Sequence, residues 1–220
     1  MARTIIALAL AAALAPAAAQ PRPILEARFI GNMAFAITDG TATLMTDFPY
    51  QSGYSRYMTY DPKMVRSATP TLSLITHRHA DHWERSLFTA TDWKVAGPAD
   101  VTFGILPSRV VQVARGGTFG PIGIEAIETP HASIGHYSYI VSWHGRRMYF
   151  SGDTESPDSL LAARSLDAAF VSPWQYRAAL RSGKPIDARR IVIYHHESGE
   201  QVAECGSGCT MPKQGDVLRF

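Results

Sequence analysis

The sequence has little of the features that mark several classes of protein. It contains only 2 cysteines among 220 residues, too few for a metal site of their own. Its 21 Lys and Arg nearly balance 19 Asp and Glu, and the basic residues occur at most in pairs such as Arg146-Arg147. This scatter disfavours a protein that binds nucleic acid. The balanced composition is sufficient for one domain with a full core, or at most two small ones.

The two cysteines, Cys205 and Cys209, are separated by three residues, two of which are glycines. We expect a disulfide between them if the protein is exported, and free thiols are the alternative. A loop this short would gain little stability from closure.

The N-terminal segment has the pattern of a secretory signal. Arg3 precedes an apolar run at 4–14, and Ala17-Ala18-Ala19 before Gln20 resembles a cleavage site. The run is too short to span a bilayer, and no Cys stands directly after the cleavage site to carry a lipid. We expect a signal peptide at 1–19 and a single domain at 20–220, periplasmic or secreted, with no stable membrane anchor. A buried N-terminal helix is the alternative.

A cluster of metal-ligand residue types follows the apolar run at 71–75. His77, His79, Asp81 and His82 lie within six residues, directly after what we predict to be a buried strand. Residues two apart share a face of an extended segment, so the spacing suits two metal ions better than one. Histidines that only complete a core hydrogen-bond network are the alternative, but four such residues would be hard to bury without a cation.

The remaining pattern predicts strands that alternate with short helices, which points to a layered α/β domain. Turn-forming Gly31-Asn32 and Asp39-Gly40 separate three N-terminal strands, which we expect to form an antiparallel meander. The predicted strands are 24–30, 33–37, 42–45, 71–75, 93–96, 110–114, 122–128, 137–143, 146–150, 168–171, one beginning at 191, and 216–220; the predicted helices are 83–89, 99–105, 158–164 and 174–181.

Further histidines and aspartates occur where these predicted strands end. His131 follows Pro130, which fixes the backbone, and His136 follows Gly135, which permits a sharp turn. One of these two histidines could complete a three-His site. Asp153 stands at another strand end, where a carboxylate can bridge two cations, and His195 with His196 ends a later strand. Since neighbouring strand residues point to opposite faces, we expect only one of that pair, His195, to bind metal.

Two other features have two interpretations each. Asp47, at the end of the third strand, is either a turn residue or an acceptor that holds a ligand imidazole. Tyr50, Tyr54, Tyr57 and Tyr60 occur on one irregular segment. They either line a substrate pocket or merely cover the sheet.

Together these residues resemble the metallo-β-lactamase-fold superfamily. The resemblance rests on His77-x-His79-x-Asp81-His82, Thr129-Pro130-His131 with Gly135-His136, Ser151-Gly152-Asp153-Thr154 and His195, and its order runs through nearly the whole mature chain. The Phe29-Ile30-Gly31 and Thr46-Asp47 pattern is most similar to the branch of ascorbate-phosphate lactonases. The resemblance implies a four-layer αββα sandwich of two mixed β-sheets.

The resemblance also implies a dinuclear metal site. His77, His79 and His131 would hold one ion, Asp81, His82 and His195 the other, and Asp153 would bridge them. Family members often have a Gly between the Pro and the ligating His, and its absence here leaves His136 as an alternative to His131. Zn²⁺ is the first expectation, with Mn²⁺ or Fe²⁺ as alternatives.

The expected activity is metal-dependent hydrolysis of a small molecule. Two adjacent cations can lower the pKa of a shared water and supply hydroxide, which would attack a lactone or another ester. Asp81 is the candidate catalytic residue, taking up or relaying a proton, and Tyr194 could assist. In this superfamily a bridging carboxylate is typical of thioesterases, lactonases and phosphodiesterases. Phosphodiester cleavage is therefore the second expectation and β-lactam cleavage the third. A non-catalytic metal-binding protein is the alternative from a different class.

Overall fold

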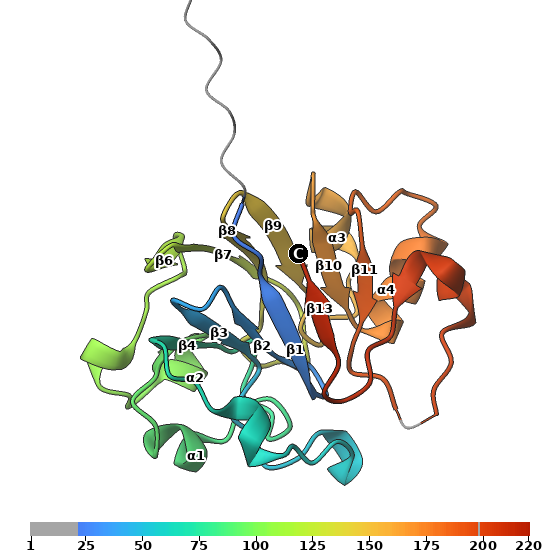
Figure 1. Cartoon of the computed structure of the whole chain (residues 1–220). Helices are drawn as coiled ribbons and strands as arrows, with labels where there is room; N and C mark the ends of the chain where they lie inside the picture. Colours follow the sequence, from blue (N-terminus) through green and yellow to red (C-terminus); the bar gives the residue numbers. More distant parts are fainter. Residues whose placement is uncertain (1–21, 198) are drawn as a thin grey trace, which may run out of the picture.

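Two β-sheets face each other across a shared core (Figure 1). The computed structural model describes residues 22–197 and 199–220, so the expected signal peptide at 1–19 lies outside them. Within the described residues, no helix is both long and apolar enough to cross a membrane.

The first sheet is mixed and includes the N-terminal meander. The neighbouring pairs β13–β1, β1–β2 and β2–β3 are antiparallel, whereas the pairs β3–β4 and β4–β5 are parallel. This confirms the predicted antiparallel meander. The order across the sheet is β13 (Val217–Arg219), β1 (Glu26–Gly31), β2 (Ala34–Thr38), β3 (Thr43–Thr46), β4 (Thr71–Leu74) and β5 (Lys94–Ala96).

The second sheet is also mixed. Its strands β12 to β9 are parallel, and β9 to β6 are antiparallel. The order is β12 (Cys209–Thr210), β11 (Ile191–Ile193), β10 (Ala168–Val171), β9 (Arg146–Phe150), β8 (Tyr137–Trp143), β7 (Ile122–Glu128) and β6 (Gly117–Phe119).

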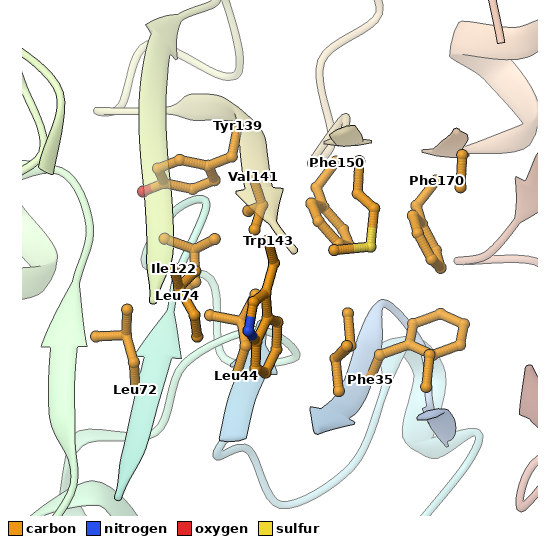
Figure 2. Close-up of a cluster of buried hydrophobic side chains, with 14 of the residues drawn as sticks. Phe35, Leu44, Leu72, Leu74, Ile122, Tyr139, Val141, Trp143, Phe150 and Phe170 are labelled. Carbon is orange, nitrogen blue, oxygen red and sulfur yellow. The ribbon is translucent and has the colours of Figure 1, made fainter. Parts of the chain in front are cut away.

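Large apolar side chains fill the space between the sheets. Figure 2 shows Phe35, Leu44 and Leu72 of the first sheet facing Trp143 and Phe170 of the second. The rings of Phe35 and Phe170 meet edge to face with centroids 4.9 Å apart. All five side chains are buried, so each sheet covers the apolar face of the other.

Short helices cover the outer faces and complete four layers. Helices α1 (Arg85–Thr89) and α2 (Ala99–Thr102) bury Phe88 and Val101 against the first sheet. Helices α3 (Asp158–Ala162) and α4 (Pro173–Arg181) bury Leu160 and Ala179 against the second. The predicted αββα fold class is therefore confirmed. Four 3₁₀ segments complete the described elements: Tyr54–Arg56, Pro62–Val65, Pro107–Arg109 and Ala203–Gly208.

The prediction of a strand at 110–114 is wrong. Only Val110 forms a bridge, to Val95, and the chain then leaves the first sheet and enters the second as β6. Val113 is buried in the core between the sheets. The segment is apolar because it crosses between the sheets. The hydrophobic pattern of such a segment is the same as that of a buried strand.

The predicted disulfide between Cys205 and Cys209 is present. It closes the last 3₁₀ segment onto the start of β12. The Cys205 side chain is buried beside Val202, among the residues that pack against α4.

Two hairpin turns, one from each sheet, are joined by an Asp–His contact. Asp39 follows β2, His144 follows β8, and the Asp39 Oδ2 to His144 Nε2 distance is 2.7 Å. Burial acts to raise the pKa of Asp39, but hydrogen bonds from His144, Thr41 and Ala42 outweigh it and hold the pKa well below its usual range. The ionised carboxylate is therefore favoured in the folded state.

We expect Asp39→Asn to lower stability near neutral pH, by an amount that shrinks in acid. Because the folded-state pKa is depressed, the carboxylate stabilises the fold above its unfolded pKa of about 3.9, and this contribution is lost as the pH falls further. Urea unfolding of both proteins between neutral pH and about pH 3 measures the difference. The exposed Asp92→Asn is the control, and a difference independent of pH would contradict the assignment.

Candidate metal centre

The predicted ligand residues come from both sheets and meet at one end of the sandwich. His77, His79, Asp81 and His82 follow β4. His131 follows β7, Asp153 follows β9 and His195 follows β11, and these three strands run in the same direction. The structure brings all seven residues together in two groups of ligand-type atoms.

The first group contains His77, His79, His131 and Asp153. The Nε2 atom of His77 lies 2.9 Å from Nδ1 of His79, which lies 3.3 Å from Nε2 of His131. The Oδ2 atom of Asp153 is 3.8 Å from Nε2 of His77. These four ligand atoms all lie within 4.8 Å of one another.

The second group contains Asp81, His82 and His195. Oδ2 of Asp81 is 3.3 Å from Nε2 of both imidazoles. Asp153 also reaches this group, with one oxygen 3.4 Å from Nε2 of His82 and the other 3.5 Å from Nε2 of His195. Asp153 is therefore the side chain that the two groups share.

The charge states of this cluster are set by burial and by mutual contact. Burial lowers the pKa of His77 and of His131, which favours neutral imidazoles. Burial acts to raise the pKa of Asp153 and of Asp81, but neighbouring histidines outweigh it and hold both pKa values well below their usual range. His82 is the exception, because Asp153 and Asp47 outweigh its burial and raise its pKa.

The cluster fits a bound cation. Nε2 of His82, Oδ1 of Asp153 and Nε2 of His195 are buried and lack a hydrogen-bond partner among the described residues. Such orphaned polar atoms are costly unless something else satisfies them. His77 and His131 are favoured as neutral imidazoles and Asp81 and Asp153 as ionised carboxylates, the forms that bind zinc-like metals. A cation bound at His82 would displace the proton of that imidazole. Ligand atoms that share one ion lie roughly 3 to 4 Å apart.

The structure shows which member of each pair of alternative histidines lies in the cluster. His136 uses both ring nitrogens within the protein: Nε2 accepts from the Asp153 backbone N–H at 2.9 Å, and Nδ1 lies 2.7 Å from Oγ1 of Thr129. Burial lowers the pKa of His136 to about 3. His196 lies outside the cluster, with Nε2 3.3 Å from the Pro212 carbonyl oxygen. His131 and His195 therefore occupy the cluster, whereas His136 holds the backbone of Asp153.

Asp47 contacts the cluster but belongs to neither ligand group. It is buried, its Oδ2 lies 3.3 Å from Nδ1 of His82, and its Oδ1 accepts the backbone N–H of Thr76 at 2.7 Å. The structure thus places Asp47 as an acceptor beside a ligand-type imidazole and beside the residue that precedes His77.

Asn32 is a site residue that the sequence did not reveal. Its amide donates to the backbone oxygen and to Oδ2 of Asp81 at 3.0 and 3.2 Å, and its own backbone oxygen accepts from the His195 N–H at 2.7 Å. Its Oδ1 also accepts from the backbone N–H of Tyr54. The only signal in the sequence was a turn-forming Gly-Asn pair, which gives no indication of these distant contacts.

Gly152 lets the Asp153 segment approach His136. Its φ is +59°, and a Cβ there would lie 2.3 Å from Nε2 of His136 and 2.9 Å from Cβ of Thr76. Gly152 N–H also donates to the Tyr194 hydroxyl at 3.2 Å. Tyr194 is itself buried, so it supports this turn, and the suggestion that it assists catalysis is not supported.

We expect Gly152→Ala to destabilise the fold by about 3 kcal/mol, because it adds a clash with the side chains of His136 and Thr76 to left-handed strain. Gly183→Ala is the matched control: its φ is +68° but nothing lies within 4 Å of an added Cβ. That control should cost only about 1 kcal/mol from strain. Urea unfolding of the two variants measures the difference, and equal losses would show that the close approach is unimportant.

The four tyrosines at 50–60 divide between both interpretations. Tyr50 is fully buried and donates to the Gly31 carbonyl oxygen at 2.8 Å, Tyr60 packs on Phe48, and Tyr57 packs against the core. Tyr54 alone is largely exposed, at 59% of its surface. Three of the rings cover the sheet, and one faces the site.

The cluster forms the floor of a cleft of about 820 Å³. Trp174, at the start of α4, forms part of its wall and donates from Nε1 to the Asp153 backbone oxygen at 3.2 Å. Glu197 and Glu200 stand beside the His195 turn. The lining residues are Tyr54, His79, Ala80, Asp81, His131, Asp153, Trp174, His195, Glu197 and Glu200.

Known proteins similar to this chain were found by sequence and by structure, although no protein-family model matches it. A UPF0173 metal-dependent hydrolase of Deinococcus radiodurans is 28% identical over 171 residues, which are 67% of this chain and 71% of that protein. The metallo-β-lactamase fold protein YhfI of Bacillus subtilis superposes with a TM-score of 0.67 and 14% identity, covering 90% of this chain and 100% of its own. Igni18, a metallo hydrolase of the archaeon Ignicoccus hospitalis, superposes with a TM-score of 0.66 and 16% identity, covering 90% and 98%.

These comparisons do not single out the ascorbate-phosphate lactonase branch, so that part of the resemblance stays a prediction. Both solved structures superpose over nine tenths of this chain, which includes two facing β-sheets. This chain therefore has the metallo-β-lactamase fold, as its histidine and aspartate motifs predict.

Proposed function

We propose that this protein is an exported hydrolase that uses two divalent metal ions to cleave an ester-like bond, in a lactone or another ester. The observation that carries the proposal is the pair of ligand groups that share Asp153 on the floor of an open cleft. The curated relative named as a metal-dependent hydrolase supports the same reaction class.

The seven clustered residues would hold the metal. His77, His79 and His131 would bind one ion, and Asp81, His82 and His195 the other, with Asp153 between them. This mixture of imidazole and carboxylate suits Zn²⁺ best, with Mn²⁺ or Fe²⁺ as alternatives. When bound, such ions lower the pKa of a coordinated water and polarise the bond to be cleaved.

The chain's own residues position the reactants. Asp81 lines the cleft, and the Asn32 amide fixes its Oδ2 beside His82 and His195, so we assign its other oxygen, Oδ1, the uptake of a proton from the attacking water. Asn32 and Asp47 fix the orientation of side chains that would bind metal. A small molecule fits the cleft, and neither a nucleic acid nor a membrane is required.

Elemental analysis of the purified protein, paired with a substrate panel, tests the proposal. We expect about two equivalents of a divalent metal per chain and hydrolysis of a lactone or another ester. A preference for a phosphodiester or a β-lactam would replace the proposed substrate class. Two equivalents of metal without hydrolysis of any member would identify a non-catalytic metal-binding protein, and absence of metal would contradict both.

Export rests on the N-terminal pattern and gains support from the Cys205–Cys209 disulfide, because such bonds persist in oxidising compartments. Mass spectrometry of the protein recovered from its natural compartment should find an N-terminus at Gln20. A protein retained in the cytoplasm with Met1 intact would overturn this part of the proposal.

A further inference from the structure

The cleft wall differs in character from its floor. The floor carries five of the seven clustered residues, with His77 and His82 buried beneath it, whereas Tyr54, Trp174 and Glu197 contribute the wall and rim and belong to neither ligand group. These residues are therefore available to contact the part of a substrate that lies away from the reacting bond.

Two aromatic rings lie against the His195 imidazole from separate elements. The Trp174 ring meets it edge to face with centroids 5.0 Å apart, and the Tyr54 ring centroid lies 6.5 Å away. Trp174 is fixed by its hydrogen bond to the Asp153 backbone, and the Tyr54 backbone is tied to Asn32. Aromatic rings offer a large contact area to a flat apolar group.

The charged side chains that line the cleft outside the two ligand groups are acidic. Glu197 and Glu200 belong to neither group, whereas bound cations would offset the charge of Asp81 and Asp153, and none of the described lining residues is Lys or Arg. Arg177 forms an ion pair with Glu200 at 3.2 Å, which leaves Glu197 as the main charge at the rim. Arg56 lines an adjoining hollow that shares Tyr54, His195 and Glu197 with the cleft, but it does not line the cleft itself. A negative substituent at the rim, away from the metal-binding floor, would thus meet repulsion from Glu197 and no Lys or Arg among the described lining residues.

We propose that the cleft selects esters whose non-reacting part is an aromatic ring without negative charge, with a cationic substituent preferred. The ring would lie against Tyr54 and Trp174, and the substituent would point toward Glu197. This inference rests on the proposed hydrolase function and narrows its substrate class.

Three aryl acetates that differ only in a meta substituent test the charge preference: 3-(trimethylammonio)phenyl, phenyl and 3-sulfonatophenyl acetate. We expect kcat/KM, after division by each ester's rate of hydroxide hydrolysis, to fall in that order. Glu197→Lys should shift the cation-to-anion ratio by about tenfold toward the anion. Glu125→Lys, on the exposed face of β7, changes the net charge equally and is the control. An unchanged ratio in Glu197→Lys would overturn the proposal.

A second pair of variants tests the aromatic wall. Tyr54→Ala should lower the ratio of kcat/KM for phenyl acetate to that for ethyl acetate by about fivefold, because it removes a ring contact. Tyr54→Phe keeps the ring and should restore the ratio. If Tyr54→Phe loses as much as Tyr54→Ala, the ring is not the determinant and the proposal fails.

Binding of unreactive probes separates this inference from the hydrolase proposal. Phenyltrimethylammonium should bind the wild-type protein more tightly than either benzenesulfonate or tetramethylammonium, with an affinity that falls in Tyr54→Ala. This pattern without hydrolysis of any ester would leave the cleft preference standing and overturn the hydrolase function. Hydrolysis of esters with equal binding of all three probes would leave the hydrolase standing and overturn the preference.

Discussion

Asp153→Asn should abolish hydrolysis and reduce bound metal below two equivalents. Asp153 lies within 3.8 Å of His77, 3.4 Å of His82 and 3.5 Å of His195, so it is the one carboxylate that reaches both ligand groups. An amide of the same shape keeps the packing but removes the negative charge and half of the acceptor capacity. Bound cations would stabilise the transition state by several kcal/mol, and the loss of this stabilisation corresponds to a fall in kcat/KM of about 10³-fold or more.

Metal content by elemental analysis and kcat/KM on the best substrate measure this effect together. Asp158→Asn, at the exposed start of α3, is the matched control and should retain both properties. Two equivalents of metal retained in Asp153→Asn would refute the bridging assignment. Full metal loss with unchanged hydrolysis would refute the metal-dependent function itself.

Asp47→Asn should lower both the stability of the fold and the affinity for metal, although Asp47 is not itself a proposed metal ligand. Asp47 is buried between His82 and the Thr76 backbone, so an amide would turn an acceptor into a donor that faces other donors. Breaking a buried charged contact of this kind costs about 3 kcal/mol or more. Loss of an acceptor behind a ligand imidazole typically lowers metal affinity by about 10- to 100-fold.

Asparagine is the right replacement because the φ of Asp47 is +41°, a left-handed value that Asn tolerates as well as Asp. Urea unfolding of the metal-free protein and metal titration with a competing dye measure the two effects. Asp61→Asn, at an exposed 3₁₀ start, is the control. A variant with unchanged metal affinity would show that Asp47 only supports the turn.

The sequence predicted the ligand cluster because its chemistry is local. His77, His79, Asp81 and His82 occupy one short segment, and each later candidate directly follows a strand that its apolar pattern reveals. In a layered sheet fold, strand ends meet at a common edge, so order and residue type were enough to place the groups together. The choice of His131 over His136 depended on hydrogen bonds that no spacing encodes.

Residues that act through long-range contacts were not predictable in this way. Asn32 reaches Asp81, 49 positions away, only because β1 and β4 lie in the same sheet. Trp174 appeared only as the start of a helix, and its place beside His195 follows from the packing of α4. Tyr54 is more exposed than Tyr50, and the two residues after it, Ser55 and Arg56, take left-handed backbone angles, which no propensity scale assigns to them.

The arrangement of ligands has a mechanical consequence for the two halves of the chain. One sheet supplies four of the clustered side chains and the other supplies three, and near them Tyr137 of β8 donates its backbone N–H to the Thr76 oxygen. Bound ions would therefore cross-link the sheets at this end, while the Asp39–His144 contact joins them at the opposite end. Removal of the ions by a chelator would then break the cross-link at the metal site and leave the Asp39–His144 contact intact. The two sheets would therefore separate first beside the cleft, where a substrate enters.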